Sequence, residues 1–339
     1  MKRHVAAFVS LLLALAFAAS AAPADPGTAE AKISKKAAKQ MAKFLKAVQE
    51  KKTDEALDLI RQVIVMEPDY AVAHHDLGVV LLQKEQVNEA IASFEKALQL
   101  QPGYAPARNA LRQSLFEAGK AALDERKFAT ANEYLLKLLA MPSPEKENEG
   151  MLAYARFYVG NNYFNLKQFP QAREHFAACR SMSGVAAEHP ELFANATYFL
   201  GLIDYESKDY PSASSAFKEY IQRHDAEEKK PQLYPIANYF VGDCLFRLLE
   251  ADMKKGQTQG MDAAVAEIVP YLERAIAHGF PNEDAHVLLG NSYVYAKNFD
   301  KAGETYEALI AAYPQSPQLE NYRLFLNELR KNRPPGKKR

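Results

Sequence analysis

The residues best suited to chemistry are few and scattered along the chain. There are two cysteines, Cys179 and Cys244, and eight histidines, of which only His74 and His75 are adjacent. Adjacent side chains on a helix point to different faces, so this pair does not predict a metal site. The motifs GxxxxGK[ST], GxGxxG, GxSxG and HExxH do not occur. The sequence therefore predicts no catalytic residue, no metal and no cofactor, and we expect a protein that is not an enzyme.

A second group of residues suits binding, because aromatic and amide side chains recur at a fixed interval. Tyr198 and Tyr239 are 41 residues apart, and so are Tyr205 and Phe246. Asparagine can donate to and accept from a peptide backbone, and tyrosine gives a large contact area at small entropic cost. We predict that a partner segment, extended or helical, binds in a groove lined by Tyr154, Phe157, Asn161, Phe164, Asn165, Asn195, Tyr198, Tyr205, Tyr239, Asp243, Phe246, Arg247, Asn291 and Tyr295.

The alternative for these aromatic residues is that they pack between neighbouring helices. An aromatic stripe at helical spacing is more often part of a core than a binding site. Both interpretations stay open at the level of sequence.

The interval of 41 residues comes from an internal repeat. Its most regular members are the glycines Gly78, Gly119, Gly160, Gly201 and Gly242. Twelve residues after the first four glycines come Ala90, Ala131, Ala172 and Ala213, and four residues further on come Phe94, Leu135, Phe176 and Phe217. One more copy surrounds Gly290, and a degenerate first copy includes Ala56, so the sequence contains about seven copies.

Each copy predicts two helices. In the copy around Gly160, the stretch 154–165 has helical periodicity, 168–170 interrupts it and 171–180 resumes it. The glycine of the first helix and the alanine of the second allow close packing, and the large residue four positions later fills the space behind them. Positions three before, one after and four after the glycine lie on a neighbouring helix face, which carries most of the predicted groove residues. The others, Tyr154, Asn165, Asn195, Arg247 and Tyr295, stand at neighbouring positions.

These positions resemble the tetratricopeptide repeat. The family pattern Trp-x₂-Leu-Gly-x₂-Tyr, Ala-x₃-Phe, Pro is met around Gly78 and Gly290, although the family's tryptophan is missing and the repeat is longer than 34 residues. The resemblance implies an all-α, right-handed solenoid over 34–315, with a capping helix at 316–331. The seven extra residues per copy are expected in 143–150, 181–189 and 223–234. It also implies a non-catalytic scaffold that binds a protein or peptide.

The amino terminus is typical of an export signal. Lys2 and Arg3 precede the apolar run 5–17, which is too short to span a bilayer, and Ala19-Ser20-Ala21 is typical of a cleavage site. We expect a signal peptide at 1–21, a flexible lead-in at 22–33, a periplasmic protein and no integral membrane segment in the mature chain. A secreted or signal-anchored protein is the alternative. Segments 216–221 and 306–317 are similar to repeats of the periplasmic Tol–Pal coordinator, which favours the bacterial cell envelope.

The charge is balanced overall but not locally. The chain has 42 Lys and Arg against 42 Asp and Glu, which argues against a nucleic-acid partner. Positive charge gathers at 32–52 and in the predicted basic tail 332–339. We expect these ends to contact an anionic envelope surface, the alternative being a solvated helix and tail. The function predicted is an envelope scaffold, or alternatively an accessory, recruiting subunit of a cell-wall or secretion enzyme.

Overall fold

The computed structural model describes residues 33–142, 149–257 and 259–331, and it places sixteen helices and no strand in them. The predicted signal peptide and basic tail, and all of the lead-in except residue 33, lie outside the described residues. The chain divides into two compact units, 1–155 and 156–339, and the division falls inside α8 (Glu149–Asn165). No helix in the described ranges is long and apolar enough to cross a membrane.

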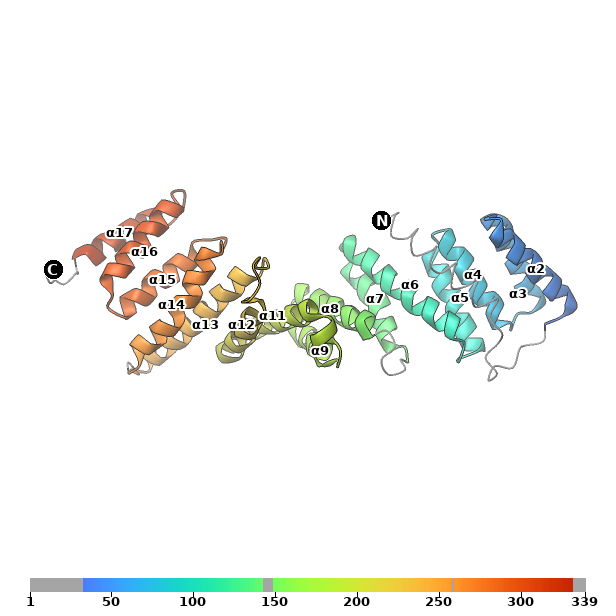
Figure 1. The fold of residues 1–339 in the computed structure, drawn as a ribbon, viewed down its shortest axis with the longest axis horizontal. Helices are drawn as coiled ribbons and strands as arrows, with labels where there is room; N and C mark the ends of the chain where they lie inside the picture. Colours follow the sequence, from blue (N-terminus) through green and yellow to red (C-terminus); the bar gives the residue numbers. More distant parts are fainter. Residues whose placement is uncertain (1–32, 143–148, 258, 332–339) are drawn as a thin grey trace. The chain divides into compact units, whose positions relative to one another are not determined.

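The first unit contains three helical pairs. Each helix packs on the next one in the chain, as Figure 1 shows. The helices are α2 (Lys35–Gln49), α3 (Thr53–Met66), α4 (Ala71–Gln83), α5 (Val87–Leu100), α6 (Ala105–Asp124) and α7 (Phe128–Ala140).

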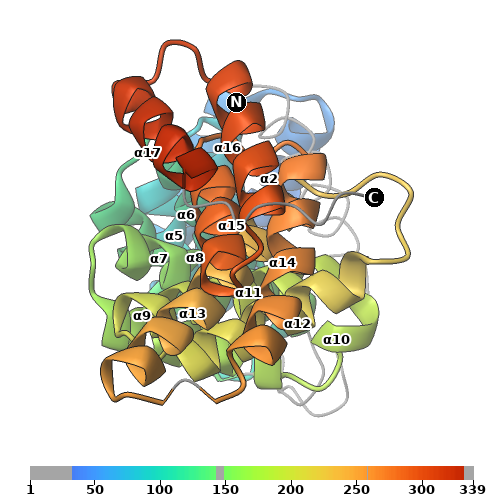
Figure 2. The same cartoon turned by 90° about the vertical axis from the view of Figure 1, so that its left-hand side faces the viewer.

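The second unit continues the same pattern and ends on a single helix. Its elements after α8 are α9 (Phe169–Ser181), the one-turn α10 (Val185–Glu188), α11 (Pro190–Glu206), α12 (Tyr210–His224), α13 (Tyr234–Lys254), α14 (Met261–Ala277), α15 (Asp284–Tyr295), α16 (Phe299–Ala312) and α17 (Leu319–Lys331). Figure 2 shows α17 beside α16, where Leu326 and Leu329 are buried. The all-helical repeat predicted from the sequence is therefore confirmed, with seven pairs in the described part of the chain.

The repeat is locked by a glycine that faces a large side chain of its partner helix. A Cβ atom added to Gly78 would lie 2.5 Å from the Phe94 ring, and one added to Gly290 would lie 2.5 Å from the Tyr306 ring. Real Cβ contacts are longer than this, so only glycine allows these helices to approach so closely. The same contact joins Gly119 to Leu135, Gly160 to Phe176 and Gly201 to Phe217, which confirms the packing role predicted for the repeat.

The turn inside each pair has a feature that the sequence did not reveal. Six of these turns place a non-glycine residue in the left-handed region, at φ between 56° and 62°: Lys51, Glu85, Arg126, Lys167, Lys208 and Lys297. The next residue's N–H then donates to a carbonyl five residues earlier, as Asp209 does to Asp204 at 2.9 Å. This is the Schellman arrangement that ends a helix, and glycine is its usual left-handed residue. A search for glycine therefore misses these turns.

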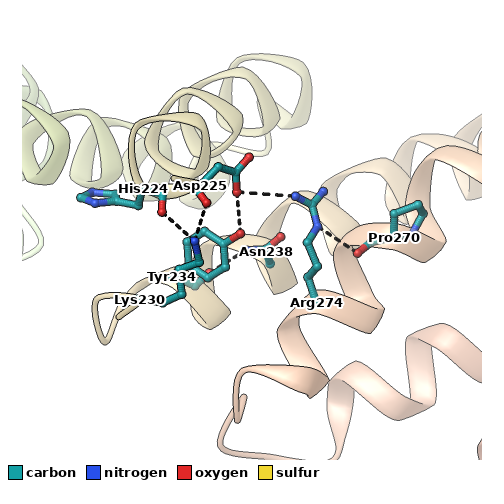
Figure 3. A network of polar contacts seen from close by, with 7 residues as sticks. All are labelled: His224, Asp225, Lys230, Tyr234, Asn238, Pro270 and Arg274. Atoms are coloured by element: carbon teal, nitrogen blue, oxygen red, sulfur yellow. Dashed lines mark hydrogen bonds and ion pairs between the residues drawn. The ribbon is translucent and has the colours of Figure 1, made fainter. Parts of the chain in front are cut away.

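The extra residues of the repeat lie partly where they were expected. The one-turn α10 occupies 185–188, and an irregular connection runs from 225 to 233, whereas 143–148 lies outside the described residues. Figure 3 shows how the second connection is held. Lys230 Nζ donates to the backbone oxygens of His224 and Asp225, at 2.9 and 2.6 Å, and so satisfies carbonyls at the end of α12. The Tyr234 hydroxyl donates to Asp225 at 2.6 Å, and Arg274 of α14 pairs with the same carboxylate at 3.8 Å.

One pair departs from the predicted spacing. Gly242 faces Leu272, thirty positions along the chain, because α13 runs about two turns further past this contact than the first helices of the other pairs, α14 begins about one turn further from it than their second helices, and the turn between them is longer. All of the extra residues lie on the far side of the contact, so the glycine contact is kept.

Candidate partner-binding surface

The most distinctive surface feature of the second unit is an exposed arginine held by a buried carboxylate. Asp243 and Arg247 stand one turn apart on α13, and Arg247 Nε donates to Asp243 Oδ2 at 2.7 Å. The Asp243 side chain is 4% exposed and the Arg247 side chain 42% exposed. The hydroxyl of Tyr205, on α11, donates to the same Oδ2 atom of Asp243. One oxygen of the carboxylate thus accepts hydrogen bonds from both Tyr205 and Arg247, and it holds the Arg247 guanidinium in place at the surface.

Two tyrosine rings flank this guanidinium. Its central carbon lies 5.5 Å from the ring centroid of Tyr205 and 5.6 Å from that of Tyr210, both within reach of a cation–π interaction. The hydrogen bond to Asp243 raises the pKa of Arg247 above its already high ordinary value, so the group is a permanent cation. Burial is the largest cause of a raised pKa for Tyr205, followed by its hydrogen bond to Asp243, so its hydroxyl stays protonated and keeps donating.

The geometry leaves part of the guanidinium available for a partner. Nε is used by Asp243, and within the described ranges no acceptor is bonded to either terminal nitrogen. These nitrogens can donate in parallel to a carboxylate, or singly to a backbone carbonyl. We call Tyr205, Tyr210, Asp243 and Arg247 the arginine cluster.

Aromatic contacts continue this surface towards α15. Phe246 precedes Arg247 in the chain, and its ring centroid lies 5.4 Å from that of Tyr295. Tyr239 stacks on Phe280 with centroids 4.3 Å apart. Burial is the largest cause of a raised pKa for Tyr295, and nearby Glu250 adds to it. Contacts therefore link α11, α13 and α15, partly through the buried Phe246.

The structure divides the predicted groove residues by burial. Tyr198, Asp243 and Phe246 are buried, and Tyr198, only 4% exposed, contacts the rings of Phe217 and Tyr220. Tyr198 and Phe246 are thus packed among neighbouring helices, as the alternative interpretation has it, and the buried Asp243 accepts a hydrogen bond from Arg247. The others are partly or fully exposed: Phe157, Asn161, Phe164, Asn165, Asn195, Tyr205, Tyr239, Arg247, Asn291 and Tyr295 in the second unit, and Tyr154 in the first.

Only some of the predicted residues contact one another. Tyr205, Asp243 and Arg247 meet in the arginine cluster, and Phe246 meets Tyr295. Phe157 and Phe164 both pack on Phe199 of α11, with centroid distances of 5.8 and 5.3 Å, and belong to a separate aromatic group. Asn291 accepts a hydrogen bond from the Tyr306 hydroxyl at 2.8 Å, so part of its capacity is used inside its own pair.

Tyr210 and Phe240 are the important residues that sequence reasoning missed. Tyr210 begins α12, whereas the prediction covered only the first helix of each pair. Phe240 stacks on Phe217 at 5.0 Å, just as Phe199 stacks on Phe176 at 5.0 Å. The signal was present in the sequence, because both stacking residues stand two positions before the repeat glycine.

The remaining reactive side chains do not assemble into a centre in the described ranges. No group of three or more His, Cys, Asp or Glu residues there could hold a metal ion. Cys179 and Cys244 are free and buried, and burial raises the pKa of each thiol to about 12. The thiolate needed for nucleophilic chemistry is therefore scarce at neutral pH.

Comparisons with known proteins agree with this architecture in two segments. Residues 71–104 and 284–316, which correspond to α4–α5 and α15–α16, each match a model of the tetratricopeptide repeat family. No curated protein matches the sequence. Among solved structures, PilF from Pseudomonas aeruginosa is 18% identical, with 75% of this chain and 97% of that chain covered and a TM-score of 0.42. The carboxy-terminal part of a repeat protein from Cytophaga hutchinsonii is 13% identical, with 83% and 98% covered and a TM-score of 0.45.

Proposed function

We propose that this protein is a non-catalytic scaffold, and that it binds a protein partner on the surface formed by α11, α13 and α15. The observation that carries the proposal is the arginine cluster. A buried carboxylate is costly to desolvate, and here it holds the Nε atom of a half-exposed guanidinium whose terminal nitrogens have no bonded acceptor in the described ranges. Arginine and tyrosine are also the residues that most often dominate binding energy at interfaces.

The chemistry of the arginine cluster suits a peptide segment. A planar guanidinium between two tyrosine rings offers donors to a carboxylate or backbone carbonyl and flat apolar area to the neighbouring side chains. The partly exposed Tyr239 and Tyr295 extend the contact area along the same surface. We therefore expect the partner segment to carry an acidic or carbonyl-rich stretch flanked by apolar residues.

We place this scaffold in the periplasm of a bacterial cell envelope. The support is the positive start, apolar run and small-residue cleavage pattern of residues 1–21. Such a scaffold either binds several envelope proteins or recruits substrates to a single cell-wall or secretion enzyme. A spread of partners on purification supports a general scaffold, and one enzyme in fixed proportion supports a recruiting subunit.

The experiment compares variants of the arginine cluster by cross-linking and quantitative co-purification from cells. The double variant Asp243→Asn/Arg247→Leu removes both charges, so no unpaired buried carboxylate remains to unfold α13. We expect at least a tenfold loss of partner, as for a central interface arginine worth 2 kcal/mol or more, with an unchanged circular dichroism spectrum.

Arg323→Ala is the matched control. Arg323 is an exposed arginine that pairs with a carboxylate of its own helix, Glu320, at 2.6 Å, but it lies on α17. We expect this variant to retain the partner. Equal recovery of partner by the double variant, the control and the natural chain would contradict the proposed surface.

A further inference from the structure

The first described helix, α2, carries only positive charges on one of its faces. Its lysines are Lys35, Lys36, Lys39, Lys43 and Lys46, and we call this set the lysine stripe. At 3.6 residues per turn the five side chains fall within an arc of about 100° and extend about 16 Å along the helix. All five are exposed, while Ala37, Met41, Phe44 and Ala47 on the other side are buried.

The lysine stripe is hardly neutralised by other parts of the protein. Within the described residues, the only carboxylate in ion-pair range of any of the five is Glu50, which lies 3.8 Å from Lys46 and is held more closely by Lys52, at 2.6 Å. Glu67 lies at the start of the helix, where it accepts a hydrogen bond from the Ser34 N–H at 3.0 Å. The face therefore keeps nearly its full positive charge.

This charge pattern works against the helix that carries it. The first turn of α2 has no acidic residue and holds Lys35 and Lys36, although the helix dipole favours negative charge at an amino-terminal end. Lys39 also stands four residues after Lys35 and four before Lys43, and like charges at this spacing repel. A pattern that lowers helix stability calls for a reason other than folding.

A need for solubility does not explain the lysine stripe, because α17 has a polar face made of charges of both signs. On α17, charges of both signs alternate and pair: Arg323 with Glu320 at 2.6 Å, and Lys331 with Glu328 at 3.0 Å. Helices α2 and α17 are the first and last described helices of the array, and terminal repeats need a polar outer face. Only α2 uses a single sign.

We propose that the lysine stripe docks the first helical pair on an anionic phospholipid surface. Lysine ammonium groups are point charges that interact with a charged surface without needing a fixed geometry. The exposed face of α2 has no arginine or aromatic residue for base reading or stacking, which nucleic-acid sites use. Small Ala38 and Ala42 lie beside the lysines and keep the helix close to a flat partner. This docking is independent of the arginine cluster.

The test is flotation of the full chain with lipid vesicles. One set contains phosphatidylcholine with about one third phosphatidylglycerol, and the other contains phosphatidylcholine alone, which measures any binding through the apolar run 5–17. We expect binding that depends on the anionic lipid and is lost at high salt. Each lysine near such a surface contributes about a fivefold change in partitioning, so Lys39→Gln/Lys43→Gln should lower binding roughly 25-fold.

Two further variants keep the test decisive. Lys96→Gln/Lys229→Gln removes the same charge from exposed positions outside the stripe and should leave binding within about twofold. Lys36→Glu should weaken binding and yet raise the melting temperature, because it places a carboxylate in the first turn of α2. Lost binding then cannot be attributed to unfolding.

Three outcomes would overturn the proposal. One is equal binding to both kinds of vesicle. Another is an equal loss for the stripe variant and its control. The third concerns duplex DNA, measured at the same salt concentration. If Lys39→Gln/Lys43→Gln lost binding to duplex DNA but kept its binding to anionic vesicles, the stripe would favour a nucleic-acid partner.

Discussion

The side chain of Phe94 has no room to move, because it is fully buried and faces Gly78 across the α4–α5 contact. We expect Gly78→Ala to lower the free energy of unfolding by about 1–2 kcal/mol. Overpacking costs about 1–3 kcal/mol, and the better helix propensity of alanine offsets up to about 1 kcal/mol of this. Urea denaturation of the full chain measures the difference.

Gly103 provides the control, because an added Cβ there meets no atom within 4 Å. Gly103→Ala should change the free energy of unfolding by less than about 0.5 kcal/mol. If the two variants were equally stable, the close approach of α4 and α5 would not be what requires glycine at position 78.

Residue types predicted the packing better than the binding surface. Glycine and a large residue sixteen positions later must meet wherever two helices approach this closely, so Gly160 and Phe176 could be paired from spacing alone. Exposure depends on the neighbouring layer, which a single repeat does not encode. Tyr198 and Tyr239 both stand three positions before a repeat glycine, but Tyr198 is buried against Tyr220 and Tyr239 is only partly buried.

At the scale of helices and turns, the non-glycine residues in the left-handed region strain the backbone, and glycine at the same positions would relieve that strain. Lys208 adopts φ 62° between α11 and α12, and its side chain is exposed. The left-handed conformation costs a non-glycine residue about 1–2 kcal/mol, and glycine loses part of that advantage through its entropy in the unfolded chain. We therefore expect Lys208→Gly to raise the free energy of unfolding by about 0.5–1 kcal/mol in urea denaturation.

Gln222→Gly is the comparison for that substitution. Gln222 is an exposed residue within α12, where glycine should cost about 0.5–1 kcal/mol. A loss of stability for both variants would mean that the turn at Lys208 does not favour glycine.

Some helix boundaries could be predicted from the sequence and others could not. The start of α9 was predicted within two residues, because the helix expected from 171 begins at Phe169, with Pro170 in its first turn. The long α13–α14 pair could not be read from the interval of 41 residues, because the partner of Gly242 moved from the expected position to Leu272. The helical periodicity of each segment does not reveal an insertion that is divided between two helices and the turn that joins them.

At the scale of the second unit, two partly buried histidines connect stability to pH. Burial lowers the pKa of His175 on α9 and of His286 on α15 below the ordinary value of 6.5. Above that value both rings are neutral in the folded and unfolded chain. As the pH falls below 6.5 the unfolded chain takes up protons first, so the free energy of unfolding decreases.

Urea denaturation of the full chain at pH 7.5 and 5.5 tests this linkage. We expect a lower midpoint at pH 5.5, and a smaller difference between the two pH values in His175→Gln/His286→Gln. Because the two histidines stand on different pairs, each single substitution should remove only part of the dependence. An undiminished difference in the double variant would assign the effect to other groups.

The elongated α13–α14 pair also offers an experimental handle. Its tip carries Gly256 and Gly260, both with positive φ and nothing within 4 Å of an added Cβ, and it lies about three turns beyond the Gly242–Leu272 contact that fixes the pair. Exposed loop tips of this kind accept inserted domains most readily. A fluorescent protein fitted into this hairpin would report where the chain resides in the living cell while leaving both of its ends, and the arginine cluster, unaltered.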